Sequence, residues 1–172
     1  KNLFDYRNLN TNTSSAGITS TLNEDGSITI SGVPIRDYVT IVVGKDITDM
    51  LEDGATYTMS QTSKNTSFYM QLIQTSISDG KKTYNHLMTR DYRSFVVDKS
   101  LYTYYIGAQI GTMADWGTES KTITRKFQLE KGSTATEFEK YGAMPSPEFP
   151  SEIINNKGIE NLFSYGNSNI SG

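Results

Sequence analysis

The stretch "LYTYYIGAQIGT", residues 101–112, decides the fold of this chain. Every second position in it is apolar or aromatic, namely Tyr104, Ile106, Ala108 and Ile110. The positions between them are Tyr105, Gly107 and Gln109. Because successive side chains of a β-strand point to opposite faces, this spacing of two predicts a strand rather than a helix. One face of that strand would be buried in a core, and the other would face outward.

The same alternation recurs elsewhere between turn signals. In "SFYMQLIQ", residues 67–74, one side carries Phe68, Met70 and Leu72. The other side carries Tyr69, Gln71 and Ile73. Further strands are expected in "GSITISG" (26–32), "YVTIVV" (38–43), "EDGATYTMSQ" (52–61), "RSFVVD" (93–98) and "TITRKFQLEKG" (122–132). Such a series predicts an all-β fold, a jelly-roll β-sandwich of two antiparallel sheets.

Two details of this expected fold can be checked. The single helical turn that we expect lies in "KDITDML", residues 45–51. The stretch 122–132 is expected to form one strand, with Ile123, Phe127 and Leu129 facing inward.

Composition supports the all-β prediction and excludes some classes of function. The 172 residues include eleven Tyr, seven Phe and 14 Gly, which suit pleated sheets and turns better than long helices. The 16 basic and 19 acidic residues give a net charge of −3, and no basic cluster suggests nucleic-acid binding. No apolar run approaches the ~20 residues of a membrane span, so we expect neither nucleic acid nor a membrane as partner.

The alternation ends after Gly132, where a different segment begins. Three of the four prolines, Pro145, Pro147 and Pro150, follow closely, and each removes a backbone donor and favours extended geometry. We therefore expect a module in residues 1–138 and an extended Pro-rich strap in 139–158. Three aromatic residues would dock this segment on the sandwich, namely Phe138, Tyr141 and Phe149.

The last residues repeat the first ones. The tripeptide "NLF" stands at residues 2–4 and again at 161–163. A following module, or a tail, is therefore expected in residues 159–172, and the sequence is expected to be a piece of a longer protein.

Catalytic motifs are absent from the sequence. Its single histidine, His86, is expected in a loop or on the surface, and no "GxSxG" elbow, Walker loop or dinucleotide fingerprint occurs. The acidic residues stand mostly in turns, so we predict no catalytic residues, no metal ligands and no cofactor. The turn "NEDG" (23–26) resembles half of a calcium loop without its later Glu, which leaves a structural Ca²⁺ open.

Aromatic and amide side chains offer better material for binding a sugar. Stacking on an apolar sugar face needs an exposed ring, and the hydroxyls need polar neighbours. Trp116, in the expected loop "GTMADWGTES", is one candidate; alternatively it plugs one end of the sandwich. A groove on one sheet would be paved by Tyr69, Gln71, Tyr105 and Gln109, unless a one-residue slip turns them inward. The long connection 78–94 would add rim residues, namely Tyr84, Arg90 and Tyr92.

The closing segment "FQLEKGSTATEFEKYGAMPSPEFPSEI", residues 127–153, resembles that of carbohydrate-binding modules in phage proteins. These are tail and baseplate proteins (distal-tail, tail-associated or receptor-binding) of phages that infect Gram-positive bacteria. The opening "NLF", "NEDGSITISG", "LEDGATYTMS" and "FVVDKSLYTYYIGAQIG" agree with the resemblance, which spans nearly the whole chain.

The resemblance implies a non-catalytic jelly-roll module that binds cell-wall polysaccharide and adheres to the host. Its partners would be the polysaccharide and neighbouring tail modules. Its location would be the tail tip or baseplate of the virion, outside the cell when it acts on the host surface. Two alternatives stay open: a structural spacer of a tail protein, and an accessory domain of a cell-wall-degrading glycosidase.

Overall fold

The computed structural model describes residues 1–142 of the chain, and these form an all-β sandwich. All strand pairs in it are antiparallel. The strands are β1 (Ile18–Leu22), β2 (Ile28–Gly32), β3 (Thr40–Asp46), β4 (Thr56–Gln61), β5 (Phe68–Ser76), β6 (Lys82–His86), β7 (Tyr92–Val96), β8 (Tyr102–Ile110), β9 (Lys121–Arg125) and β10 (Phe127–Lys131). The all-β prediction is confirmed.

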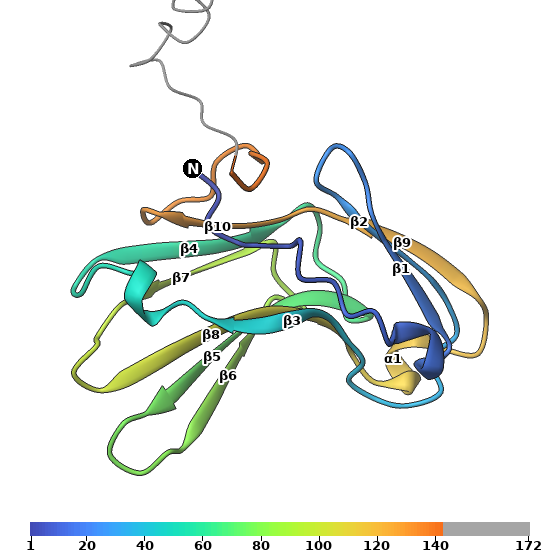
Figure 1. The fold of residues 1–172 in the computed structure, drawn as a ribbon, viewed down its shortest axis with the longest axis horizontal. Helices are drawn as coiled ribbons and strands as arrows, with labels where there is room; N and C mark the ends of the chain where they lie inside the picture. Colours follow the sequence, from blue (N-terminus) through green and yellow to red (C-terminus); the bar gives the residue numbers. More distant parts are fainter. Residues whose placement is uncertain (143–172) are drawn as a thin grey trace, which may run out of the picture.

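The sandwich has one large sheet on one side and two smaller sheets on the other. The large sheet has the strand order β3-β8-β5-β6, and the smaller ones are β10-β4-β7 and β1-β2-β9. Figure 1 shows the large sheet facing the layer that contains β10, β4 and β7, with β1, β2 and β9 beside that layer. Hydrogen bonding therefore divides the expected two sheets into three.

The division arises where the expected strand 122–132 breaks. Residues 121–125 pair with β2, whereas residues 127–131 pair with β4. Between them, the Lys126 backbone exchanges hydrogen bonds with Thr62 instead of continuing a ladder. The alternating stretch 122–132 thus contributes strands to two different sheets, and the expectation of a single strand is wrong. Phe127 and Leu129 are buried as predicted, and Ile123 is half-buried against the core.

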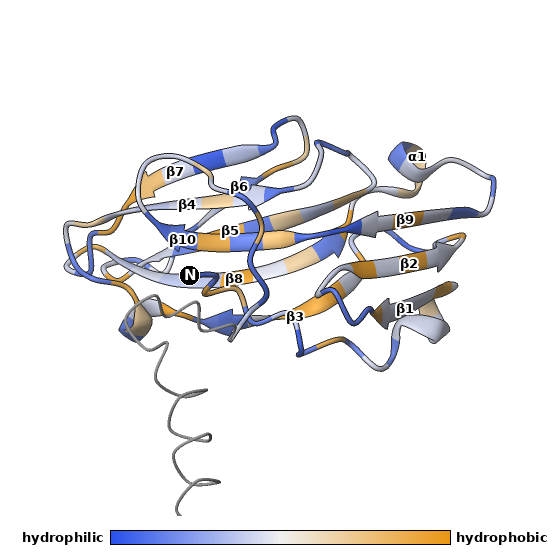
Figure 2. Cartoon of the chain, turned by 90° about the horizontal axis from the view of Figure 1, so that it is seen from above, coloured by the Kyte–Doolittle hydropathy of each residue, from blue (hydrophilic) through white to orange (hydrophobic). Residues whose placement is uncertain are grey.

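The longest pairing joins β5 and β8 and confirms the alternation on which the fold prediction rests. Their register runs from Phe68 opposite Ile110 to Ser76 opposite Tyr102. The apolar positions of both strands are buried, namely Phe68, Met70, Leu72, Tyr104, Ile106, Ala108 and Ile110. Figure 2 shows hydrophobic positions alternating with hydrophilic ones along several strands. One face of the large sheet therefore belongs to the core, and the other faces outward.

Two strands have no counterpart among the expected elements, β1 and β6. Strand β6 lies at an edge of the large sheet, and three of its five residues are exposed. Because an edge strand buries few side chains, its sequence "KTYNH" lacks the apolar alternation that reveals a strand. The expected helical turn in 45–51 is confirmed as a 3₁₀ turn, η2 (Thr48–Met50). A second 3₁₀ turn, η1 (Thr13–Ala16), and a short helix, α1 (Met113–Trp116), complete the fold.

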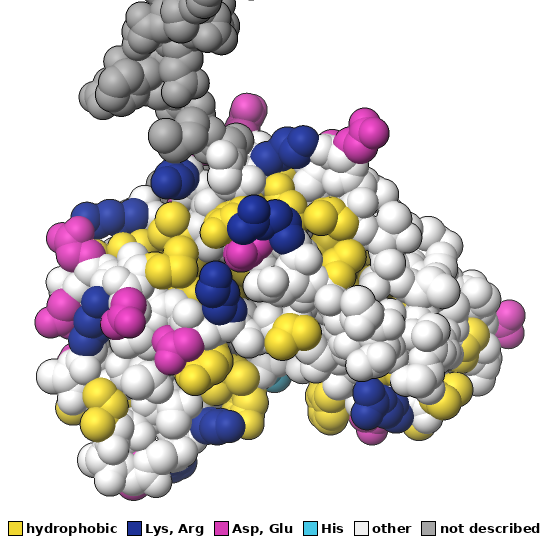
Figure 3. Space-filling model, viewed as in Figure 1, with side chains coloured by type: hydrophobic (Ala, Val, Ile, Leu, Met, Phe, Trp, Pro, Cys, Tyr) yellow, Lys and Arg dark blue, Asp and Glu magenta, His cyan; other side chains and the backbone are white. Residues whose placement is uncertain are grey.

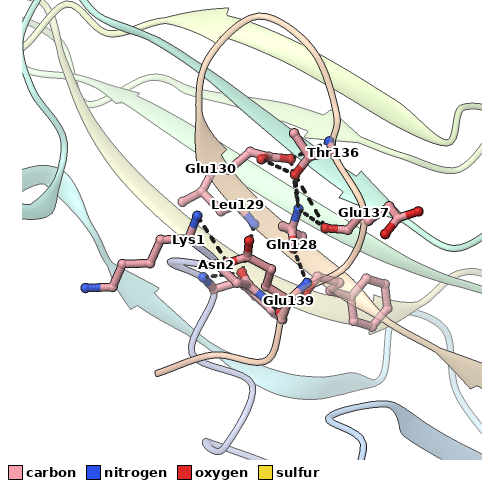
Figure 4. Close-up of polar contacts among 10 residues, drawn as sticks. Lys1, Asn2, Gln128, Leu129, Glu130, Thr136, Glu137 and Glu139 are labelled. Carbon is pink, nitrogen blue, oxygen red and sulfur yellow. Dashed lines mark hydrogen bonds and ion pairs between the residues drawn. The ribbon is translucent and has the colours of Figure 1, made fainter. Parts of the chain in front are cut away.

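The two ends of the described chain are tied together on the β10 side (Figure 4). The buried Asn2 amide donates to the carbonyls of Phe127 and Glu139, and its oxygen accepts from Leu129 N. The buried Glu130 carboxylate accepts hydrogen bonds from the backbone and hydroxyl of Thr136. Residues at the two ends of the described chain therefore stabilise each other through β10.

Aromatic contacts complete this closure. Phe138 and Tyr141 pack against the core as predicted, and the Tyr6 hydroxyl accepts a 2.8 Å hydrogen bond from Tyr141 N. Phe149, most of the Pro-rich strap and the expected following module lie outside the described residues. No helix within residues 1–142 is long and apolar enough to cross a bilayer.

Candidate functional site

The outward face of the large sheet carries a groove made of three adjoining hollows. Their volumes are about 410, 210 and 280 Å³. The first two share Gln71, Tyr84 and Gln109, and the last two share Ile73 and Tyr105. Figure 3 shows this side of the molecule hollowed between the protruding β5–β6 hairpin and the loops around α1. The shared residues make the three hollows one elongated site, which we call the groove.

The register of the sheet arranges the groove in rows across its strands. In one row, Tyr84 of β6 and Tyr105 of β8 both pair with Ile73 of β5. Tyr84 is 54% exposed and Tyr105 is 40% exposed, so both rings are accessible. Because neighbouring strands lie about 4.8 Å apart, the two tyrosine backbones stand about 10 Å apart on either side of Ile73. This row offers two aromatic rings above an apolar floor.

The next row supplies the depth of the groove. There Gln71 of β5 pairs with Gly107 of β8 and with His86 of β6. Gly107 has no side chain, and a Cβ built on it would lie 2.9 Å from the carbonyl oxygen of Val42. Register shifts in β3 bring Val42 and Gly44 to this point of the lining. A glycine is required where the bulged β3 leans over β8, and it leaves the floor open there.

Amide groups line the centre of the groove. Gln71 and Gln109 both contribute to the first two hollows. The Gln109 Nε2 donates a 3.0 Å hydrogen bond to the hydroxyl of Tyr69, its paired neighbour on β5. An amide both donates and accepts hydrogen bonds, which suits a ligand rich in hydroxyls. Three of the predicted groove residues, Gln71, Tyr105 and Gln109, therefore meet on one surface with Tyr84, which was expected at the rim.

Tyr69 lies on the same side of the sheet but is fully buried. Its ring centroid is 5.2 Å from that of His86, and burial raises the pKa of its hydroxyl. The expectation that the Tyr69 ring paves the surface is therefore wrong, because neighbouring side chains cover it. Tyr69 supports the groove from below through its hydrogen bond with Gln109.

Trp116 is also fully buried, so the expectation of an exposed indole is wrong. Its Nε1 donates to the Gly32 carbonyl at 3.2 Å, and Lys121 approaches the ring face. The burial follows from α1, whose Thr112–Asp115 capping box turns the chain so that the indole enters the core. This is the alternative in which Trp116 plugs one end of the sandwich.

Arg90 and Tyr92 do not join the groove. Tyr92 lies on β7 and lines a hollow of about 140 Å³ in the other layer, next to Lys126 and Phe138. Arg90 lies in the connection before β7 and lines none of the three hollows of the groove. The expected rim splits because the connection 78–94 contains β6, which carries Tyr84 to one layer while β7 joins the other.

His86, Tyr38, Ile73 and Thr40 line the groove without having been predicted for it. The loop position expected for His86 is wrong, since this residue ends β6, where it is half-buried between the rings of Tyr69 and Tyr84. Burial lowers the pKa of His86, and Arg93 lowers it further. Tyr38 is exposed and has a φ of 54°, a left-handed conformation rare for an aromatic residue. Tyr38 opens the expected strand 38–43, which begins only at Thr40 in the structure, and His86 lies in no expected strand. The alternation therefore assigned neither of them to the groove.

Within residues 1–142, no group of three or more His, Cys, Asp or Glu side chains could hold a metal ion. In the calcium-like turn, the Asp25 carboxylate accepts hydrogen bonds from the backbone and hydroxyl of Ser27 and pairs with Lys126 at 3.0 Å. That carboxylate therefore stabilises its own turn.

No family model and no curated protein matches this chain. Similar solved structures include the following three. A glycosylation-associated protein complex from Streptococcus agalactiae (Gap123) is 14% identical, with a TM-score of 0.49 over 80% of this chain and 47% of the other. A structure of accessory secretory protein 1,2 and 3 from Streptococcus pneumoniae is 12% identical, with a TM-score of 0.46 over 74% of this chain and 91% of the other.

The third similar structure is a carbohydrate-binding module from the β-sandwich superfamily. It is 10% identical, with a TM-score of 0.39 over 77% of this chain and 62% of the other. At this level of similarity none of the three decides what the present chain binds. The chain also spans only about half the length of the first of them.

Proposed function

We propose that this chain is a non-catalytic carbohydrate-binding module whose groove binds a polysaccharide. One observation carries the proposal: the exposed rings of Tyr84 and Tyr105 line the same hollow as the Gln71 and Gln109 amides, on the outward face of the large sheet. A sugar ring has apolar C–H faces that pack on aromatic rings and a rim of hydroxyls that bond to amides. The groove combines both kinds of contact in one elongated surface.

The location of the groove also suits an adhesion module. Figure 1 shows the N-terminus and the end of the described chain on the β10 side, whereas the groove lies on the outward face of β3, β8, β5 and β6. Both ends of the described chain thus lie away from the groove. A shallow site of this kind binds weakly, and several copies held close together would raise the overall affinity.

The sequence resemblance adds the biological setting to the proposal. The segment 127–153 resembles carbohydrate-binding modules of phage tail and baseplate proteins, so the proposed ligand is a cell-wall polysaccharide of a Gram-positive host. The proposed location is the tail tip or baseplate of the virion, where the module would assist adsorption. Its other partners would be adjacent modules of the tail.

Retention on purified Gram-positive cell walls tests this function. The chain should sediment with walls in a saturable manner, and the double variant Tyr84→Ala/Tyr105→Ala should not. The matched control is Tyr92→Ala, which removes an equally exposed tyrosine from the opposite layer and should retain binding. Circular dichroism would verify that all variants remain folded.

The burial of Tyr69 and Trp116 fits a structural spacer as well, because a spacer needs no exposed aromatic rings. The exposed Tyr84 and Tyr105 distinguish the two functions. No saturable binding to any wall preparation would favour the spacer. Release of reducing sugar from the walls would favour a glycosidase-associated activity instead.

A further inference from the structure

The groove differs from the rest of the molecule in its charge. Thirteen described residues line its first two hollows, and none of them is Asp, Glu, Lys or Arg. Since charged residues make up 20% of the chain, a lining of this size would ordinarily include about two or three of them. The third hollow adds a single charged side chain, Lys82, at its end.

His86 is the one basic side chain in those first two hollows, and its environment favours the neutral ring. The imidazole lies against Tyr69 and Tyr84, with ring centroids 5.2 and 6.2 Å away. Burial lowers the pKa of His86, and the positive charge of Arg93 lowers it further. The buried Nε2 has no hydrogen-bond partner among the described residues, so an added proton would have no acceptor there. At neutral pH the centre of the groove therefore carries no charge.

A carboxylate borders the groove beside one of its exposed rings. Asp46 of β3 pairs with Tyr105, and hydrogen bonds from the backbone and side chain of Thr48, followed by one from Tyr105, lower the pKa of Asp46. Asp46 is consequently ionised at neutral pH. The charges of Asp46, Lys82 and Arg93 thus lie around the first two hollows, whose own lining contains no ionised side chain.

We propose that the groove selects an uncharged polysaccharide and rejects anionic wall polymers. This inference rests on the proposed function of the groove. A carboxylate or phosphate entering the first two hollows would meet amides, tyrosines and aliphatic side chains. It would lose hydration there without gaining a cation, which disfavours binding. A neutral sugar replaces the same water at lower cost, because its hydroxyls can bond to Gln71 and Gln109.

The first experiment uses wall polysaccharide released from a preparation that retains the chain. Anion exchange divides this material into an uncharged flow-through and a bound anionic fraction. Binding of each fraction is then measured by affinity electrophoresis at about 0.05 and about 0.5 M NaCl. The uncharged fraction should bind, with an affinity that changes by less than about twofold with salt, because no ion pair is being screened.

Oxidation of the primary alcohols of the bound polymer to carboxylates provides a matched ligand. The chain length and linkage are kept, and only charge is added. We expect the oxidised polymer to bind at least about tenfold more weakly. Equal or tighter binding of the oxidised polymer would overturn the inference.

A pair of variants tests the same point from the protein side. Thr40 lines the groove on the edge strand β3 and is half-buried. With an uncharged ligand, Thr40→Lys and Thr40→Glu should change its affinity by similar factors. With an anionic ligand, Thr40→Lys should tighten binding and Thr40→Glu should weaken it, which would contradict the inference.

The outcomes separate this inference from the function on which it rests. If the anionic fraction alone binds and Tyr84→Ala/Tyr105→Ala abolishes that binding, the groove is a carbohydrate site but the uncharged ligand class is wrong. If no wall preparation or fraction is retained, the proposed function fails and the inference fails with it.

Discussion

Gln109 donates a 3.0 Å hydrogen bond from its Nε2 to the hydroxyl of Tyr69, directly opposite on the neighbouring strand. One partner lines the groove, and the other is fully buried. The bond fixes the orientation of the Gln109 amide, so that its acceptor and its remaining donor capacity have defined directions before any ligand arrives. Preorganisation of this kind lowers the entropy lost on binding.

Tyr69→Phe should weaken binding while leaving the fold intact. The variant keeps the buried ring and removes only the hydroxyl, so the loss of stability should be about 1 kcal/mol. Urea unfolding gives that value, and wall retention gives the affinity. If Tyr69→Phe binds as well as the original chain, then the hydrogen bond does not position Gln109 for a ligand.

Single replacement of either exposed tyrosine should reduce affinity without affecting stability. Tyr84→Ala and Tyr105→Ala should each weaken binding by about tenfold, or about 1.4 kcal/mol, since each removes one stacking face. Tyr84→Phe and Tyr105→Phe should retain most of the affinity. Equal loss in the Phe variants would mean that the hydroxyls, and not the rings, contact the sugar.

Trp116→Ala should affect stability far more than binding. The indole is fully buried and bonded to Gly32, so its removal leaves a large cavity and should cost about 3–5 kcal/mol in the free energy of unfolding. Trp116→Phe fills more of the space and should remain folded at 25 °C with normal wall retention. A folded Trp116→Phe that no longer binds walls would restore Trp116 as a contact residue.

The contacts that tie the two ends of the described chain together should weaken in acid, because the Glu130 carboxylate takes part in them. Burial acts to raise the pKa of this carboxyl, but hydrogen bonds from Thr136 and Gln128 outweigh it and hold the pKa below the ordinary value of 4.5. An acid with a lowered pKa stabilises the folded state above its unfolded pKa. That stabilisation is lost as the pH falls from about 4.5 through the folded-state value.

Thermal unfolding between about pH 3 and pH 7 measures this effect of Glu130. Glu130→Gln keeps the shape and cannot titrate, so its stability should fall less steeply in acid than that of the original chain. The difference between the two curves isolates Glu130 from other carboxyls such as Asp25. Parallel curves would show that Glu130 does not contribute to the acid sensitivity.

Part of the candidate site could be predicted because successive side chains of a strand point to opposite faces of the sheet. Once Tyr104 and Ile106 face the core, Tyr105 and Gln109 must face outward, and the same holds for Gln71 between Met70 and Leu72. This alternation does not reveal whether side chains from other strands cover an outward-facing residue. Tyr69 and Gln71 both point outward, yet Gln71 is only 8% exposed and Tyr69 is fully buried, with the His86 ring of β6 lying against it.

The sequence by itself determined the all-β class, the inward faces of β5 and β8, and the side of the sheet that could bind a ligand. These depend on the alternation of side chains along one strand, which is a local property of the backbone. Only the tertiary structure decided that Tyr84 and His86 line the same face as Gln71 and Gln109, and that Trp116 lies in the core. It also decided that residues 121–131 form two strands in different sheets. These depend on which strands pair and where they bend, and pairing joins residues that are distant in the chain.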